Sequence, residues 1–381
     1  MPPLNGGIGT AVADLAPALV ANGINLTIVG VYPPSLLRQN PLPPLDRTPN
    51  LTILRLASPW TRLPFRWRLP LERRTLRRFL TRHLRHSKTD ALLADDYDGW
   101  LPIPPASTLP LITRLNGSNL VYDHLLQRTG HPALHQSEQR MLQSARAWIG
   151  VSRFFLDATT SLVPPPPSLV TTVIPNAIDA QAFSPLPSSE TIPGRIVFHN
   201  SLTPRKGLQD LLQAFSQILP LRPDATLFLC GSAPNPDWLE KQLSALPPLA
   251  RQAVTLTGRI DRQSALQNIL GRASVACYPS HLETFGLSPV EAMAMQRVTL
   301  YTDCGPARDV IRDGIDGFIT PVANPSALAE KLLHTLALNP DQRQAIGQAA
   351  RSTVLQRFDR PIVAHQMADF LRSLIASTSS R

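Results

Sequence analysis

The segment from Pro279 to Gln296, PSHLETFGLSPVEAMAMQ, restricts the fold of this chain more than any other stretch. The small and aromatic residues just before it, Ala273 to Tyr278, are typical of a short buried strand. Ser288, Pro289 and Glu291 fit a helix start, with Ser at the N-cap, Pro at N1 and Glu at N3. A strand, a polar loop and a helix in this order form the repeating unit of an α/β protein.

Two carboxylates, Glu283 and Glu291, frame the loop of this unit, with seven residues between them. A loop of exposed amides that enters a helix N-terminus is suited to bind a phosphate or a sugar hydroxyl. Each glutamate also has a simpler interpretation, because Glu291 could complete a capping box and Glu283 could be a solvated loop residue. Their joint appearance on one strand-to-helix loop favours a binding site.

The segment resembles the signature of the retaining GT-B glycosyltransferases of family four, in which two glutamates with seven residues between them enclose a Phe-Gly turn. The similarity continues through short motifs in residues 302–318 (TDCGP, DG and DGF) and back to residues 173–176 (VIPN), so it covers nearly the whole chain. The resemblance implies that Glu283 lies beside the transferred sugar and that Glu291 holds the ribose of the nucleotide.

The same resemblance supplies further donor-binding candidates. Lys206, with Gly207, matches the lysine that neutralises the donor diphosphate, the main electrostatic task of such a transfer. A plain surface lysine at a helix start would be opposed by the helix dipole. Ser201 stands where the family usually has an arginine, and Arg205 could compensate. The remaining candidates are Arg259 for the base or ribose and the backbone amides of Phe285, Gly286 and Leu287 for the sugar and phosphate.

The chain opens on a glycine loop, formed by Gly6, Gly7 and Gly9, that is predicted to enter a helix. It is a weak match to a dinucleotide fingerprint, because the third glycine and the leading strand are both absent. The family resemblance puts this loop beside the donor phosphate and the acceptor. Only four residues precede Asn5, so we expect the sequence to lack the first strand of its domain.

Asn116 is the candidate catalytic residue of the first half. A predicted strand, residues 109–115, delivers it to the edge at which open α/β sheets bind ligands. Many relatives have a histidine here, close to the sugar, so the asparagine leaves that role open. His124 could face the site, although a structural histidine is the commoner case. The acidic run of residues 95–98 is expected to cap helices, because GT-B enzymes do not rely on an acid-x-acid metal motif.

Residues 60–88 are the most basic stretch, with ten Arg or Lys residues and only Glu72 to oppose them. Part of it, from Leu71, has the apolar spacing of a helix, and three aromatic residues precede it. Basic side chains with flanking aromatics suit an anionic membrane surface, and no nucleic-acid-binding module accompanies them. A solvated arginine-rich helix remains the alternative.

The composition is that of a soluble globular protein, with 43% hydrophobic and 17% charged residues. No apolar run approaches the roughly 18 residues needed to cross a bilayer, and no signal peptide opens the chain. We therefore expect a cytoplasmic protein that contacts the inner face of the membrane peripherally. The three cysteines have no metal-ligand spacing, and neither a metal nor another cofactor is expected, since the nucleotide sugar is a substrate.

The sequence thus predicts an α/β protein with the GT-B fold, in which two Rossmann-like, doubly wound domains face each other across a cleft. The first covers residues 1–182, the second covers residues 190–358, and a last helix near residues 360–378 packs back on the first. The resemblance implies a hexosyltransferase-type enzyme (EC 2.4). It would move a sugar from a nucleotide sugar to a glycan, lipid or small-molecule acceptor with retention of anomeric configuration.

Two alternatives remain open. A GT-B nucleotide-sugar epimerase would share the donor site. A degenerate, non-catalytic GT-B protein would bind a sugar nucleotide or a partner, and it is supported by departures from the family pattern at Asn116, Ala177, Ser201 and Gln296. Against such a loss, both glutamates and the lysine persist together.

Overall fold

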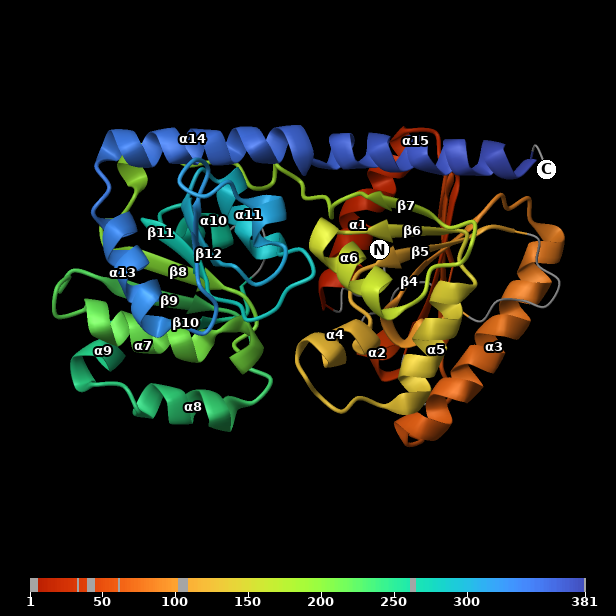
Figure 1. Cartoon of the computed structure of the whole chain (residues 1–381), viewed down its shortest axis with the longest axis horizontal. Coiled ribbons are helices and arrows are strands. Elements are labelled where there is room, and N and C mark those ends of the chain that lie inside the picture. Colours follow the sequence, from red (N-terminus) through yellow and green to blue (C-terminus); the bar gives the residue numbers. More distant parts are fainter. Residues whose placement is uncertain are drawn as a thin grey trace. The chain divides into compact units, whose positions relative to one another are not determined.

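The computed structural model describes residues 6–32, 34–39, 45–60, 62–101, 109–260 and 265–379 (Figure 1). The chain divides into two compact units. Unit 1 contains residues Met1–Ala177 and Val363–Arg381, and unit 2 contains residues Ile178–Ile362. The change of unit therefore comes at residue 178, a few residues before the boundary drawn from the sequence.

Unit 1 alternates strands and helices. Its parallel strands β4, β5, β6 and β7 form one sheet in that order, and β1, β3 and β2 form another, with β2 antiparallel to β3. Every residue of β5 and β6 is buried, as expected for parallel strands that are covered on both faces. The elements are α1 (Gly6–Ala21), β1 (Leu26–Tyr32), α2 (Pro34–Gln39), β2 (Leu45–Thr48), β3 (Leu51–Ala57), α3 (Phe65–His86), β4 (Leu92–Asp95), η1 (Tyr97–Gly99), β5 (Leu111–Leu115), α4 (Asn119–Leu125), α5 (Pro132–Gln143), β6 (Ala147–Gly150), α6 (Arg153–Leu162) and β7 (Val170–Val173).

The last helix of the chain, α15 (Arg360–Ser379), starts in unit 2 and continues in unit 1. Its buried residues Val363 and Met367 share a core with Leu19 of α1 and Ile112 of β5. Farther along the helix, Leu374 is buried in the same core. This packing makes the C-terminal helix part of the hydrophobic core of unit 1.

The predicted glycine loop at the start of the chain is helical from Gly6 onward. Gly6, Gly7 and Gly9 all lie in the first turns of α1, and the residues before Gly6 lie outside the described residues. Glycine costs about 1 kcal/mol relative to alanine in a helix interior. Burial of Leu15 and Leu19 against the sheet supplies the tertiary packing that overrides this local preference.

The basic helix α3 begins at Phe65, six residues before the start predicted from the sequence. Pro70 lies inside it, whereas the sequence pattern predicts a helix that begins after that proline. Leu69, Leu76 and Leu80 are buried along one face. Among the described residues, neither this helix nor any other is long and apolar enough to cross a bilayer.

Unit 2 is a doubly wound α/β sheet of six parallel strands in the order β10-β9-β8-β11-β12-β13. Leu211 and Phe215 of α7 and Leu332 of α13 form a core with the strands. The elements are η2 (Ser188–Glu190), β8 (Arg195–His199), η3 (Pro204–Lys206), α7 (Leu208–Ile218), β9 (Thr226–Cys230), α8 (Pro236–Ser244), α9 (Pro248–Gln252), β10 (Val254–Gly258), α10 (Ala265–Leu270), β11 (Val275–Tyr278), α11 (Leu287–Ala294), β12 (Val298–Thr302), α12 (Ala307–Val310), β13 (Phe318–Thr320), α13 (Pro325–Leu336) and α14 (Pro340–Arg357).

Two departures from the family pattern can be placed in this fold. Ala177 is not among the described residues with positive φ, so alanine costs little where glycine is usual. Gln296 has a φ of 58° directly after α11, so it occupies a left-handed position that favours glycine. The chain therefore turns sharply at Gln296, and a residue with a Cβ is strained in that conformation.

Candidate active site

The strand order of unit 2 reverses between β8 and β11. The chain runs from β8 outward through β9 to β10, and then returns to place β11, β12 and β13 on the other side of β8. In open α/β sheets, ligands bind beyond the carboxyl ends of the strands at such a switch point. The loop after β8 and the loop after β11 both start there, and they carry Lys206 and Glu283.

Gly207 lets these two loops pack against each other. Its φ is 70°, and a Cβ at this position would lie 1.7 Å from the carbonyl oxygen of Pro279. No side chain fits so close an approach, so the contact requires glycine. It brings Lys206, the last residue of η3, to Glu283, with 2.5 Å between Nζ and Oε1.

The Glu283 carboxylate is buried, with 9% of its side chain exposed. The Ser280 hydroxyl donates to Oε1 over 2.8 Å, and the Arg205 guanidinium lies 4.0 Å from Oε2. Burial by itself would raise the pKa of Glu283, but the charges of Lys206 and Arg205 outweigh it and hold the pKa below its ordinary value. Glu283 is therefore an anion at neutral pH, clamped between cations.

Arg205 and Lys206 reach the same loop although they are adjacent in the sequence. Arg205 also donates from Nη1 to the backbone oxygen of Leu282 over 3.0 Å. Ser201 is exposed in the loop after β8, and its N–H donates to the side chain of Asn200 over 2.9 Å. The second cation near Glu283 is thus Arg205, in a stretch where the family usually places its arginine at residue 201.

Glu291 is held by two side chains that the sequence analysis missed. Nε2 of His199 lies 2.9 Å from Oε2 of Glu291, and Nδ1 of His199 lies 2.6 Å from the Tyr278 hydroxyl. All three residues are buried. His199 ends β8 and Tyr278 ends β11, so the switch point itself fixes the Glu291 carboxylate. The sequence feature that could have identified His199 and Tyr278 is a polar residue at the carboxyl end of each of these strands.

The helix that carries Glu291 starts earlier than predicted. Its N-cap is Gly286, with a φ of 95°, whereas the sequence pattern predicts Ser288 at this position. Glu291 is consequently the fifth helical residue and lies too far along to close a capping box, so that simpler interpretation is wrong. A Cβ at residue 286 would lie 2.6 Å from the Tyr301 hydroxyl oxygen, which is why glycine makes the turn.

The other donor-binding candidates are placed as follows. The Phe285 ring is buried and packs edge-on against Phe358, with 5.5 Å between the ring centroids. This anchor leaves Gly286 and Leu287 at the start of α11, where the first N–H groups have no partner within the helix. Arg259 is exposed after β10, two strands away from β8, so the sheet does not bring it next to the Lys206–Glu283 pair.

In unit 1, Asn116 follows β5 and is held by the acidic run that begins with Asp95, the last residue of β4. Its side-chain nitrogen donates to Oδ1 of Asp95 over 2.5 Å, and its N–H donates to Oδ1 of Asp96 over 2.9 Å. His124 is exposed in the last turn of α4 and is not a core residue. Among the described residues, no group of three or more His, Cys, Asp or Glu side chains is arranged to hold a metal ion.

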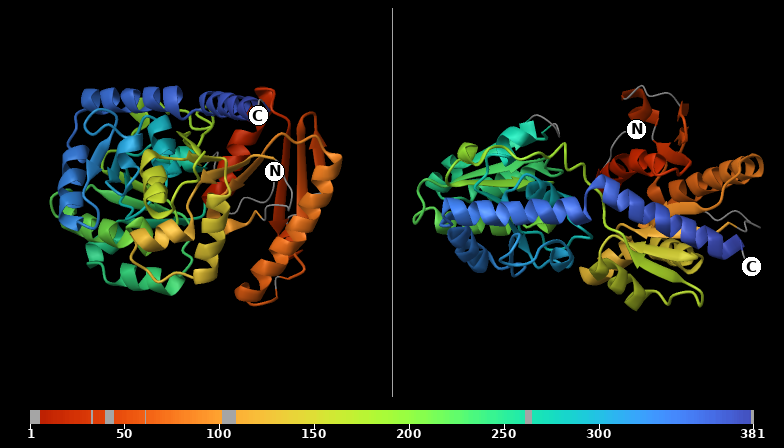
Figure 2. Two further views of the ribbon diagram at one scale, coloured as in Figure 1. Left: turned by 45° about the vertical axis from the view of Figure 1, so that its right-hand side comes forward. Right: turned by 90° about the horizontal axis from the view of Figure 1, so that it is seen from above.

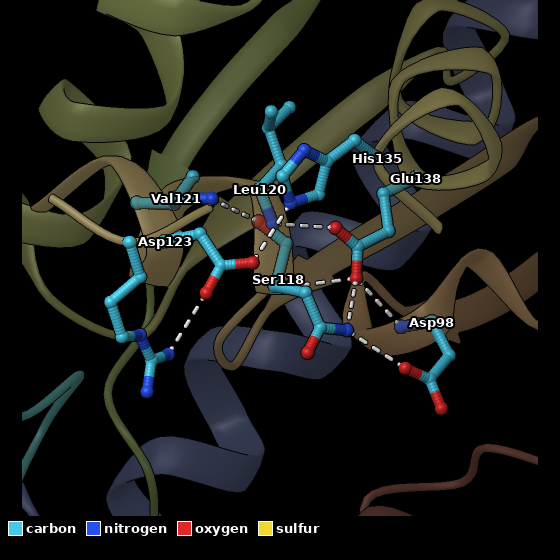
Figure 3. A network of polar contacts seen from close by, with 9 residues as sticks. Asp98, Ser118, Leu120, Val121, Asp123, His135 and Glu138 are labelled. Atoms are coloured by element: carbon cyan, nitrogen blue, oxygen red, sulfur yellow. Dashed lines mark hydrogen bonds and ion pairs between the residues drawn. The ribbon is translucent and has the colours of Figure 1, made fainter. Parts of the chain in front are cut away.

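Asp96 and Glu138 accept hydrogen bonds from five consecutive backbone N–H groups, those of residues 116–120. Asp96 takes the first three. Glu138 of α5 takes those of residues 119 and 120 as well as that of Asp98 (Figure 3). Burial raises the pKa of Asp96 to about 8, against the opposing N–H groups, and burial raises that of Glu138 too. The turn into α4 is thus fixed by the chain's own carboxylates.

Comparison with known proteins gives two family matches. A family model described as "Glycosyltransferase Family 4" matches residues 5–182, and one described as "Glycosyl transferases group 1" matches residues 188–353. Alpha-maltose-1-phosphate synthase of Mycobacterium tuberculosis is 28% identical over 258 residues, which cover 63% of this chain and 66% of that protein. The chain spans about half to two thirds of the length of the first curated relatives it matches.

Several solved structures resemble nearly the whole chain. Sucrose-phosphate synthase from Thermosynechococcus elongatus superimposes with a TM-score of 0.78 at 22% identity, over 98% of this chain and 94% of that one. The Anabaena protein HepE, solved in complex with UDP and glucose, gives a TM-score of 0.71 at 18% identity, over 97% of this chain and 98% of that one. At these identities the likeness establishes the fold.

Proposed function

This chain belongs to the glycosyltransferase family that the group 1 and family 4 models describe, with the GT-B fold, and we propose that it transfers a sugar from a nucleotide sugar to an acceptor. We further propose a glycan, lipid or small molecule as the acceptor and retention of anomeric configuration. The observation that carries this function is the Lys206–Glu283 pair at the switch point of unit 2.

In this proposal Lys206 and Arg205 neutralise the diphosphate that leaves the sugar. An ammonium has three donors, so Lys206 keeps Glu283 while it also binds a phosphate oxygen. Both cations lie beside the loop that enters α11, whose N-terminus also favours an anion. The cations of the protein therefore neutralise the negative charge of the leaving group in this proposal, which requires no metal or other cofactor.

Glu283 takes the place beside the transferred sugar. Because its neighbours keep it ionised, it acts as a hydrogen-bond acceptor for sugar hydroxyls and stabilises the positive charge that develops on the sugar ring. Glu291 accepts hydrogen bonds from the ribose hydroxyls. The His199–Tyr278 pair fixes the position of Glu291 for that purpose.

The roles proposed in unit 1 concern the acceptor side. Asn116 presents an amide whose nitrogen is held by Asp95, which leaves its oxygen to accept from a sugar hydroxyl. Gly6, Gly7 and Gly9, in the first turns of α1, are proposed to contact the acceptor. We propose a cytoplasmic protein whose residues 60–88 contact an anionic membrane surface. The basic helix α3 and Trp67, which is 60% exposed, support this contact.

A transfer assay with a matched control tests the function. Wild type, Lys206→Met and Lys241→Met are incubated with UDP-, GDP- and ADP-sugars and a panel of glycan and lipid acceptors. Lys241 is an exposed lysine of α8, outside the proposed site. We expect acceptor-dependent release of the nucleoside diphosphate by wild type and Lys241→Met, and a loss of about 100-fold in Lys206→Met. Product coupling constants in NMR report the anomeric configuration.

Other outcomes would contradict the proposal. Conversion of the donor to an epimer without any acceptor would identify an epimerase. Full activity in Lys206→Met would remove the lysine from the reaction, and absence of nucleotide release with every donor and acceptor would favour a non-catalytic protein.

A further inference from the structure

A groove of about 480 Å³ lies in unit 1 between α3 and α5. The two helices run side by side in the views of Figures 1 and 2, the first in orange and the second in yellow. The volume lies within the range of small-molecule sites. None of the residues proposed for sugar transfer lines this groove, so its function is a separate question.

Four arginines line the groove. Arg73, Arg74 and Arg77 come from one side of α3, and Arg140 comes from α5. Arg73 and Arg140 line the groove from different helices, and burial, followed by the like charge of Arg140, lowers the pKa of Arg73. Like charges so placed repel, and an anion between them would relieve the repulsion.

Among the described residues, no acidic side chain lines the groove to compensate this charge. None of the lining residues is acidic, and the four arginines form no ion pair with any residue that the structure describes. The acidic residue of each helix is engaged elsewhere. Glu72 of α3 accepts from the Ser58 hydroxyl, and Glu138 of α5 accepts from the backbone of the turn into α4.

The floor of the groove is apolar. Leu69 and Leu134 are buried beneath it, and Pro70 lines it. Planar guanidinium groups bind phosphate oxygens in pairs, and an apolar floor accepts the carbon part of the same ligand. We propose that the groove between α3 and α5 binds a phosphate-bearing ligand, with Arg73 and Arg140 gripping the phosphate from opposite sides.

This site differs from the diffuse membrane attraction proposed above. A general attraction to anionic lipids depends on total charge, so any two arginines of α3 would contribute alike. A built site depends on particular arginines and on their guanidinium geometry. The phosphate could belong to a soluble compound or to a lipid headgroup, and the two sources share this chemistry.

The test uses the full chain, two soluble phosphate compounds and lipid vesicles. Titration calorimetry follows inorganic diphosphate and glycerol phosphate, and flotation follows vesicles of phosphatidylglycerol against vesicles of phosphatidylcholine. The groove pair Arg73→Gln/Arg140→Gln is compared with Arg78→Gln/Arg82→Gln, which removes two exposed charges of α3 outside the groove. A third variant, Arg73→Lys/Arg140→Lys, keeps the charge and removes the fork geometry. Circular dichroism checks that each variant is folded.

We expect the groove pair to weaken binding by about tenfold or more, and the control pair by less than about twofold. The lysine pair should bind several-fold more weakly than wild type. Binding of the soluble probes would identify a free phosphate compound, whereas binding of phosphatidylglycerol vesicles alone would identify a lipid headgroup. Equal weakening by the groove and control pairs, or no binding of any probe by wild type, would overturn the proposal.

Discussion

Buried carboxylates are held in opposite ways in the two units. In unit 2, Glu283 lies against Lys206 and Arg205, and their charges keep its pKa below the ordinary value. In unit 1, Asp96 and Glu138 are held by backbone N–H groups, and burial raises the pKa of both. A side-chain cation can bind an incoming diphosphate together with its carboxylate, whereas backbone N–H groups that are fixed in a turn cannot move to a ligand. The first arrangement therefore suits a binding site, and the second suits a fixed scaffold.

The largest expected effect is on activity, at Glu283. Glu283→Gln should lower kcat/KM by about 100-fold or more, because the neutral amide no longer stabilises positive charge on the sugar. The fold should be retained, since the amide oxygen still accepts from Lys206 and Ser280. Steady-state kinetics and circular dichroism are the measurements. If Glu283→Gln lost folded protein but kept the wild-type kcat/KM, Glu283 would only support the fold, as Asp96 and Glu138 do in unit 1.

The next effect is on stability, at Glu138. Glu138→Gln should lower the free energy of unfolding by about 2 kcal/mol, because the amide presents its own N–H to a backbone N–H that needs an acceptor. Four of the five tryptophans lie in unit 1, so fluorescence in a urea titration reports mainly on that unit. Asp369→Asn, at a carboxylate of unit 1 with 55% side-chain exposure, is the control and should cost less than about 1 kcal/mol.

The third effect is on the pH dependence. Because the pKa of Asp96 is raised from its ordinary value to about 8, the folded chain binds more protons than the unfolded chain between those values. The free energy of unfolding of unit 1 should therefore fall as the pH rises from 5 to 8, by up to about 1.4 kcal/mol per pH unit. Asp96→Asn should flatten this slope.

Glu283 provides the opposite sign. Its folded pKa is lowered, so its contribution to stability is complete above the ordinary pKa of a glutamate and is lost only as the pH falls below that value. Glu283→Gln should leave the slope between pH 5 and 8 unchanged. Identical slopes for wild type and Asp96→Asn would show that Asp96 does not titrate in this window.

The smallest effect concerns the end of the helix that carries Glu291. Gln296→Gly should raise the free energy of unfolding by about 1 kcal/mol, because glycine adopts the left-handed backbone without the steric cost of a Cβ. Kinetic constants should stay unchanged, since the residue is outside the proposed donor site. A stabilisation that also lowered kcat would mean that strain at Gln296 serves the site of unit 2.

The two units also differ in how far the sequence predicted them. The motif of two glutamates and the lysine was visible in the sequence, and the structure brings Lys206 and Glu283 together through the turn at Gly207. The start of α11 was misplaced because Pro289 resembles a first helical residue, whereas the backbone turn is made by Gly286. The roles of His199 and Tyr278 could be predicted only from the strand order, because it places the ends of β8 and β11 side by side, and no local sequence pattern contains that order.

The unit 1 scaffold was harder to predict. The acidic run was expected to cap helices, and Asp96 does satisfy amides at the turn into α4. Glu138 was missed, because it lies in the middle of α5, about 20 residues from the amides it accepts from. The fold depends on such long-range partners, and amphipathic spacing alone describes Glu138 as an ordinary polar residue of a helix.

The most direct test of the central claim is a melting-temperature panel with UDP, GDP, ADP and their sugar conjugates. It is run on wild type, Glu291→Ala and the control Lys241→Met. A nucleotide at a hundred times its dissociation constant stabilises by about 2.7 kcal/mol, which is measurable. We predict that nucleotides of one base raise the melting temperature of wild type and the control, and that Glu291→Ala loses the shift. An equal shift in all three proteins would contradict a donor site at the unit 2 switch point.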